Sequence, residues 1–265
     1  MNLTKSRKWM VTLFYFVMIG TNAAAVLLPL NGVSTQEVSN TYGNLFAPAG
    51  VTFSIWSVIY LLLAGFVIYQ WQTPDKQSIL ADTSSSNMLR IIFILSSILN
   101  SVWLVLWQYF HINLSVIVML FLLISLIYVN QLLANATLTK KDYILVRLPF
   151  SIYFGWITIA TIANITAFFV DKDIAFLQDN QPIWTVIILI IGVVIISVTI
   201  IKNHDIAYGI ATLWAYLGIL LEHQAQGGWN HKYPIIINTV FVSLIVIVCV
   251  CLYVLALEVK KKNNK

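Results

Sequence analysis

Residues 44–60 read NLFAPAGVTFSIWSVIY. This stretch begins an apolar segment with Pro48 and Gly50, and then carries Thr, Ser, Trp and Tyr at positions where an ordinary membrane span carries Leu, Ile and Val. Polar side chains inside a membrane need partners within the protein, because the hydrocarbon offers none. The stretch is therefore predicted to form one wall of an intramembrane pocket, with Pro48 and Gly50 at the opening of that pocket.

The composition around this stretch is that of a membrane protein. The chain has 265 residues, of which 60% are hydrophobic and 9% are charged, whereas about a quarter of the residues are charged in a typical soluble domain. A helix needs about 20 mostly apolar residues to cross a bilayer. The sequence accordingly predicts an all-α transmembrane bundle of eight spans, at residues 9–28, 49–71, 88–110, 114–134, 143–170, 183–201, 206–221 and 234–257.

The distribution of positive charge predicts how this bundle is oriented. The chain carries 15 Lys and Arg residues and a formal net charge of +5. With a cytoplasmic N-terminus, all of these residues except Lys172 and Lys232 fall on the cytoplasmic side. An excess of Lys and Arg in cytoplasmic loops is the usual rule for membrane proteins. We therefore expect a plasma-membrane protein with both termini in the cytoplasm, and we assign the charge to orientation and not to nucleic-acid binding.

The first span has a second interpretation. A basic start followed by an apolar run and Ala residues at 23–25 also fits a cleavable signal peptide, and its removal would leave seven spans in the same orientation. Retention is the preferred interpretation, because the apolar run is long and Gly20 with Ala24 forms a face suited to helix packing.

Three of the predicted spans each carry an aromatic stripe that includes a polar residue. Residues three or four apart lie on one face of a helix. At about 1.5 Å per residue, the three stripes converge in the outer half of the bundle. The second span contributes Trp56 and Tyr60 together with Thr52, the third contributes Asn100, Trp103 and Trp107, and the fifth contributes Tyr153, Trp156 and Asn164.

These stripes allow two interpretations. One is a well-packed helical core in which the Asn amides hold helices together. The other is a pocket for a flat or amphipathic molecule, because ligand sites are usually apolar and aromatic with a few fixed polar groups. In the second interpretation the Trp and Tyr rings stack on the bound molecule, and Asn100 and Asn164 orient its polar edge or hold the helices.

Three motifs in this constellation resemble the tryptophan-rich sensory protein family, also called the translocator protein or peripheral benzodiazepine receptor family. They are the second-span run of Ala47-Pro48-Ala49-Gly50 followed by Trp56 and Tyr60, the third-span run from Leu99-Asn100 to Trp103, and the fifth-span set of Trp156, Ala160-Thr161 and Asn164. The resemblance covers roughly residues 9–170. The chain departs from the family pattern at Gly50, where the family has Trp, and at Ala47, where it has a second Pro.

The resemblance implies a fold and a class of ligand. The family is a five-helix membrane bundle that binds porphyrins and, in some members, sterols and benzodiazepine-like drugs, and it commonly dimerises. It implies a translocator-like core at residues 1–170, three additional helices at residues 171–265, a tetrapyrrole as one possible ligand, and a homodimer as one possible assembly. The last three spans have no counterpart in the five-helix family, and the substitution at Gly50 weakens the case for tetrapyrrole stacking. Ala207, Ala211, Ala215 and Gly218 give the seventh span a face on which it can pack closely.

Other functional classes find less support in the sequence. No HExxH, Cys-His or nucleophile motif occurs, so we expect no enzyme activity, no metal site and no resident cofactor. His223 and His231 fit a metal site or a cap over the pocket, but solvated loop residues are the expected outcome. The predicted function is a sensor or transfer protein for a hydrophobic planar or amphipathic molecule such as a porphyrin or a lipid. A small-molecule permease and an accessory membrane subunit without a ligand remain the alternatives.

Overall fold

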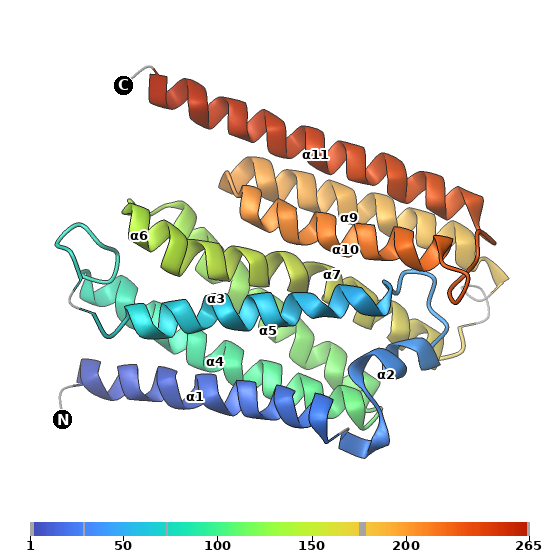
Figure 1. Cartoon of the computed structure of the whole chain (residues 1–265), viewed down its shortest axis with the longest axis horizontal. Helices are drawn as coiled ribbons and strands as arrows, with labels where there is room; N and C mark the ends of the chain where they lie inside the picture. The colour runs from blue at the N-terminus through green and yellow to red at the C-terminus, as the bar shows by residue number, and fades with distance from the viewer. Residues whose placement is uncertain (1–2, 29, 73, 175–178, 264–265) are drawn as a thin grey trace.

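The computed structural model describes residues 3–28, 30–72, 74–174 and 179–263, and within these ranges the chain is helical and contains no strand (Figure 1). All eight predicted spans are confirmed as helices that are long and apolar enough to cross a membrane. In chain order the helices are α1 (Leu3–Leu27), η1 (Leu30–Gly32), α2 (Thr35–Thr41), η2 (Gly50–Ser54), α3 (Ile55–Tyr69), α4 (Thr83–Gln108), α5 (Ile112–Ala134), α6 (Lys140–Asp142), η3 (Tyr143–Arg147), α7 (Leu148–Asp171), α9 (Gln181–Asn203), α10 (Ile206–Gln224) and α11 (Pro234–Asn263).

Several helices begin earlier than hydropathy alone predicts. The α4 helix begins at Thr83, because the side chain of Asp82 accepts a hydrogen bond from the Ser85 amide and caps the first turn. The α1 helix likewise includes the basic turn before Trp9. Hydropathy misses such polar turns, since they extend a helix beyond the hydrocarbon without adding apolar residues.

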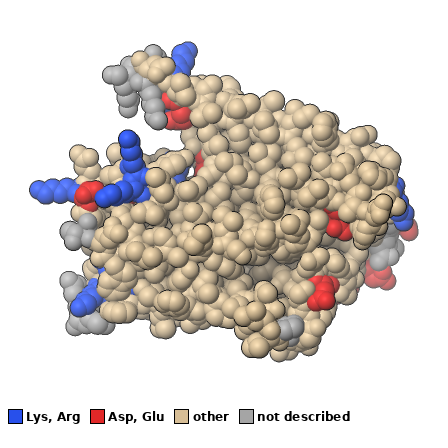
Figure 2. All heavy atoms as spheres, in the orientation of Figure 1, with Lys and Arg blue, Asp and Glu red and all other residues tan. Residues whose placement is uncertain are grey.

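The eight long helices lie side by side and alternate in direction, so the bundle has two distinct ends. Both chain termini lie at one end, which we call the termini side, and α2 lies at the other, which we call the α2 side (Figure 1). In Figure 2 the Lys and Arg side chains gather mainly on the termini side. The helices α1, α4, α5 and α7 pack in that order, and α3 packs on α7 and α1.

The last three long helices form a second group that joins the first through α10. The α11 helix packs on α9 and α10, and α10 packs along α7 and also contacts η2. The predicted close-packing face of the seventh span is confirmed, since Ala207, Ala211, Ala215 and Gly218 are all buried. We call the contact between α7 and α10 the α7–α10 seam. On its α7 side, a β-carbon added to Gly155 would lie 2.8 Å from the β-carbon of Ala211 and against the carbonyl of Tyr208.

The seam generates a first prediction. Gly155→Ala should lower the free energy of unfolding by about 1–3 kcal/mol, the usual cost of overpacking, because the Tyr208 carbonyl belongs to the α10 backbone and has no rotamer by which to move away. Thermal unfolding of the purified protein in detergent measures this. The matched control is Gly20→Ala on α1, where an added β-carbon meets nothing within 4 Å. Equal stability of the two variants would contradict the tight α7–α10 seam.

Candidate functional site

The aromatic side chains predicted to line a pocket form one cluster in the structure. Trp56 is at its centre: its ring stacks on Tyr60 at 5.5 Å with the planes 20° apart, and it lies 6.1 Å from Trp103. The rings of Tyr153 and Trp156 each form an edge-to-face pair with that of Trp56, with ring centroids 6.0 Å apart. Aromatic pairs at these separations stabilise beyond simple burial. The spacing argument thus brought α3, α4 and α7 together correctly.

One member of the predicted α3 stripe faces elsewhere. Thr52 lies in the 3₁₀ segment η2, where a residue turns further than in an α-helix. Its buried side chain therefore packs on Gly218 of α10 and not beside Trp56. The assumption of an α-helix from residue 49 onward was wrong at this position.

Asn100 joins three helices and is fully buried. Its amide donates to the hydroxyl of Tyr153 on α7 at 3.1 Å, and its carbonyl accepts from the amide of Asn22 on α1 at 2.8 Å. An Asn inside a bundle is stabilised only when its donors and acceptors are paired in this way. This part of the predicted constellation therefore holds the helices in position.

Asn164 makes an equivalent connection nearer to the α2 side. Its carbonyl accepts from the indole nitrogen of Trp103 at 2.9 Å, and its amide donates to the hydroxyl of Ser115 on α5 at 3.0 Å. This bond connects the Trp103 ring, which lies beside Trp56, to α7.

Trp107 connects the cluster to α2. Its indole nitrogen donates to the carbonyl of Thr35 at 3.1 Å, and its ring lies 6.1 Å from that of Tyr42. Burial, together with the neighbouring carboxylate of Asp171, raises the pKa of Tyr42 to about 12, so this phenol keeps its proton. At the start of α2, hydrogen bonds from the backbone and side chain of Ser34 lower the pKa of Glu37 in a capping box that fixes this short helix.

Two cavities adjoin the cluster, and Trp56 lines both. The first, between α3, α4, α7 and α2, has a volume of about 40 Å³, which is far below the usual 300 Å³ or more of a ligand pocket. The second is a groove of about 360 Å³ between α1, α3 and α2, which we call the α1–α3 groove. The small cavity is lined by Pro48, Trp56, Trp103, Trp107, Trp156 and Asn164 among others, whereas the groove is lined by Trp56, Tyr60, Asn22, Ser57, Ala23 and Gln36 among others.

The predicted site residues thus divide into three groups, of which the first lines the small cavity and comprises Pro48, Trp103, Trp107, Trp156 and Asn164. Trp56 and Tyr60 face the groove, while Asn100 and Tyr153 line neither space and support the rings from beneath. Gly50, predicted at the opening, lines neither cavity. The side chain of Gln36 from α2 occupies the space that a β-carbon on Gly50 would enter. The position where the related family carries Trp is therefore covered by a polar side chain from another helix.

Two buried polar atoms beside these cavities have no hydrogen-bond partner among the described residues, namely the Tyr60 hydroxyl and the Trp156 indole nitrogen. The amides of Asn22 and Asn100 lie near the Tyr60 hydroxyl, but their hydrogen bonds go to each other and to neighbouring groups. Buried polar groups are nearly always paired. The Tyr60 hydroxyl therefore lies among these amides inside the bundle, whereas the residue as a whole lines the α1–α3 groove.

The comparisons with known proteins assign a family. A family model described as TSPO-like protein matches residues 8–253. The chain belongs to the TSPO-like family. Comparison with curated proteins finds no match, and comparison with solved structures finds none either.

Family membership suggests a membrane protein that binds or transports ligands, and the family is generally non-enzymatic. The match extends beyond residue 170, where the resemblance in the sequence ended, through α9, α10 and most of α11. The last three helices therefore belong to the pattern of this TSPO-like family, although the five-helix bundle offered no counterpart for them.

The α10 helix also holds the predicted pocket wall of this TSPO-like protein. Gly218 of α10 accepts a hydrogen bond from the Ala49 amide at 3.0 Å. The indole nitrogen of Trp214 donates to the Thr52 carbonyl at 2.9 Å. His223 contacts the Leu45 carbonyl through its Nε2 atom at 2.9 Å. The wall is thus bound on one side to the aromatic cluster and on the other to α10.

This contact corrects the interpretation of His223 as a solvated loop residue. Its side chain is fully buried in the last turn of α10, where it lies 6.2 Å from the ring of Trp229. His231 is exposed, as expected for a loop residue. Among the described residues no group of three or more His, Cys, Asp or Glu side chains is placed to hold a metal ion.

Sequence reasoning missed two residues that matter for the site, Asn22 and Trp214. An Asn in the middle of an apolar span is itself a signal for an interior position, so Asn22 could have been found. The role of Trp214 could not, because its partner is a backbone carbonyl 162 residues away in sequence. Such a pairing depends on where α10 docks.

The connection through Asn164 generates a second prediction. Asn164→Ala should lower the free energy of unfolding by about 1–3 kcal/mol, because it leaves the buried Trp103 indole N–H without an acceptor. It should also shift the indole fluorescence, since Trp103 loses its fixed partner. Asn40→Ala, at an exposed position on α2, is the matched control and should leave both unchanged. A stable, spectroscopically unaltered Asn164→Ala protein would contradict the proposed connection.

Proposed function

We propose that this TSPO-like protein binds a hydrophobic planar or amphipathic small molecule in the α1–α3 groove, as a sensor or transfer protein. The observation that carries the proposal is the combination of a groove of about 360 Å³ with the stacked rings of Trp56 and Tyr60 on its wall. This volume lies at the lower end of the range for small-molecule pockets. A porphyrin or a lipid of similar breadth would extend beyond the groove into the bilayer.

The chemistry of the walls supports a flat ligand with one polar edge. Trp56 and Tyr60 are partly buried, so their nearly parallel rings leave an aromatic surface toward the groove. Asn22 and Gln36 supply polar groups around it. Ala23, Val26 and Ser57 on the rim are exposed. A molecule dissolved in the bilayer can therefore reach the groove from the side, between α1 and α3.

The remaining predicted residues act on this groove from behind it. The rings of Trp103 and Trp156 pack on that of Trp56, and Asn100 and Asn164 connect the helices that carry them. A wall that is held before binding costs less conformational entropy when the ligand arrives. In this proposal the buried cluster is the preorganised support, and the groove is the place of contact.

The third prediction tests the groove with a porphyrin as the probe. Titration into the purified chain should quench intrinsic Trp fluorescence in a saturable manner. Ser57→Phe should weaken the apparent affinity by about tenfold or more, because the new ring fills space on the groove wall at a cost of about 1–3 kcal/mol. Ser54→Phe is the matched control, since Ser54 is also exposed, lies one helical turn earlier and does not line the groove.

Equal effects of Ser57→Phe and Ser54→Phe would place the probe elsewhere on the protein. An absence of saturable quenching across porphyrins, sterols and other flat amphiphiles would overturn the proposed function. Trp56→Phe is a further check on where the probe binds. If the probe sits in the groove, this variant should reduce both the quenching amplitude and the affinity.

We further propose that the protein resides in the plasma membrane with the termini side in the cytoplasm. The support is the concentration of Lys and Arg on the termini side (Figure 2), as the positive-inside rule requires. A fourth prediction follows. Epitope tags at either terminus should react with antibody only after permeabilisation, whereas an epitope inserted after Gln226, between α10 and α11, should react on intact cells. The reverse pattern would contradict the orientation.

A further inference from the structure

A larger hollow lies at the opposite end of the bundle from the aromatic cluster. It has a volume of about 930 Å³ and lies on the termini side, between the end of α5, the α6–η3 segment, the α9–α10 turn and the last turns of α11. We call it the basic cleft. Figure 1 shows the C-terminal turns of α11 standing apart from α6, and Figure 2 shows the surface hollowed between them, with basic side chains on both sides.

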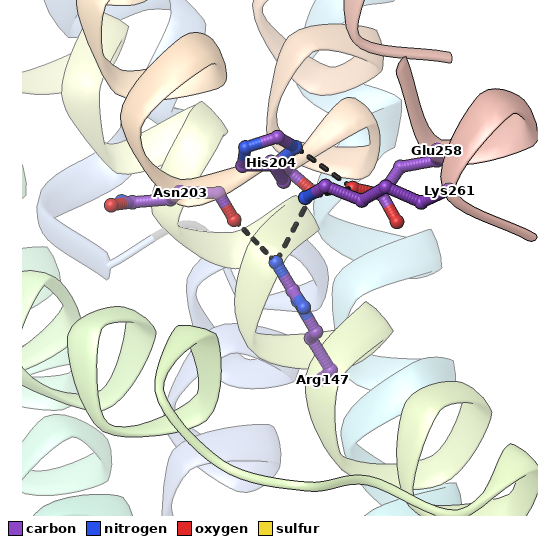
Figure 3. A network of polar contacts seen from close by, with 5 residues as sticks. All are labelled: Arg147, Asn203, His204, Glu258 and Lys261. Carbon is purple, nitrogen blue, oxygen red and sulfur yellow. Dashed lines mark hydrogen bonds and ion pairs between the residues drawn. The ribbon is translucent and has the colours of Figure 1, made fainter. Parts of the chain in front are cut away.

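The charges around the basic cleft are strongly unequal. Its walls carry the four cations Lys140, Arg147, Lys202 and Lys261 against the single carboxylate of Glu258. That carboxylate is already engaged, because it lies 3.4 Å from the Lys261 ammonium and 2.8 Å from the Nδ1 atom of His204 (Figure 3). The approach of His204 is close but does not have hydrogen-bond alignment.

Three of the four cations have no carboxylate partner among the described residues. Lys140 and Lys202 form no ion pair there. Arg147 uses its Nη2 atom to donate to the carbonyls of Asn203 at 2.6 Å and His204 at 3.2 Å (Figure 3). These neutral acceptors orient the guanidinium and leave its charge uncompensated.

The basic cleft differs from an ordinary solvated surface because its cations line the walls of one concave hollow. Cations held together on the walls of a low-dielectric hollow reinforce one another and attract anions. The position of Arg147 is also specifically built, because it sits with Tyr143 in η3, a five-residue π-helical turn that opens the fifth span. Such turns occur often at functional sites. Here the guanidinium lies 5.7 Å from the Tyr143 ring, which holds it from a second side.

The basic cleft is amphipathic as well as basic. Leu138, Ile206 and Leu255 line it along with the polar groups. Leu255 and Tyr143 are 48% and 43% exposed, so apolar surface continues from the hollow onto the outer faces of the helices. A soluble anion would leave this apolar surface uncovered, whereas the acyl chains of a lipid would pack against it.

We propose that the basic cleft binds the phosphate group of an anionic membrane lipid. Arg147 presents the planar fork that suits phosphate oxygens, while Lys140 and Lys202 add charge. The apolar side chains receive the chains of the lipid at the level where its headgroup meets the hydrocarbon. Basic pockets between transmembrane helices are a recognised form of headgroup recognition. Because the walls come from α5–η3 and from α9–α11, a bound lipid bridges the two helical groups.

The fifth prediction tests the phosphate and its source. The full chain in neutral detergent is titrated with short-chain phosphatidylglycerol, and an apparent Kd is taken from the rise in Tm, since a molecule that binds only the folded state stabilises it. Phosphatidylcholine tests the requirement for net negative charge, and glycerol phosphate tests a free anion. Only phosphatidylglycerol should raise Tm, and added salt should weaken its effect.

Two matched double variants locate the binding. Lys140→Gln with Lys202→Gln removes two cations of the basic cleft and should weaken phosphatidylglycerol binding by about 25-fold, at about fivefold for each basic residue. Lys141→Gln with Lys260→Gln removes two exposed neighbours that do not line the cleft and should leave the Kd unchanged. Arg147→Lys keeps the charge but loses the fork, and should weaken binding without abolishing it.

Each other outcome overturns the proposal. Equal weakening in the two double variants would indicate a general effect of surface charge. Equal stabilisation by phosphatidylcholine would remove the role of the anion. Stabilisation by glycerol phosphate as strong as that by phosphatidylglycerol would replace the lipid by a soluble phosphate compound. No rise of Tm with phosphatidylglycerol would exclude the site.

Discussion

The structure depends on how the non-helical backbone between α2 and α3 is satisfied. Residues 42–49 leave the helix close to the bundle, and polar backbone groups buried there have no lipid partner to replace them. The carbonyls of Leu45 and Thr52 and the amide of Ala49 all find partners on α10. The α10 helix is therefore part of what allows this irregular wall to exist inside the bundle.

The same constraint organises the candidate site. The amides of Asn100 and Asn164 are buried, and each is paired across two or more helices. These bonds set the rings of Tyr153 and Trp103, which in turn support Trp56. The two interpretations of the aromatic stripes are thus both represented in the molecule. Most of the cluster is packed core, and one face of it, at Trp56 and Tyr60, borders a groove of ligand size.

The two ends of the bundle carry different chemistry. On the α2 side, aromatic and amide groups surround a largely apolar groove, and on the termini side four cations, one of them paired with Glu258, surround an amphipathic hollow. The α7 helix runs between the two ends: it carries Tyr153 and Trp156, which pack on Trp56, and it follows Arg147 in the chain.

The sequence by itself determined the class of fold, the eight spans, the meeting of α3, α4 and α7 and the packing face of α10, since hydropathy and helical periodicity act locally. It also identified the family through residues that recur along single helices. Only the tertiary structure decided that Thr52 turns toward α10, that Gln36 covers Gly50, that the space among the Trp rings is nearly filled, and that the larger hollows lie elsewhere. Those features depend on pairs such as Trp214 and Thr52, which lie 162 residues apart, and a cavity is what remains after every such pair has formed.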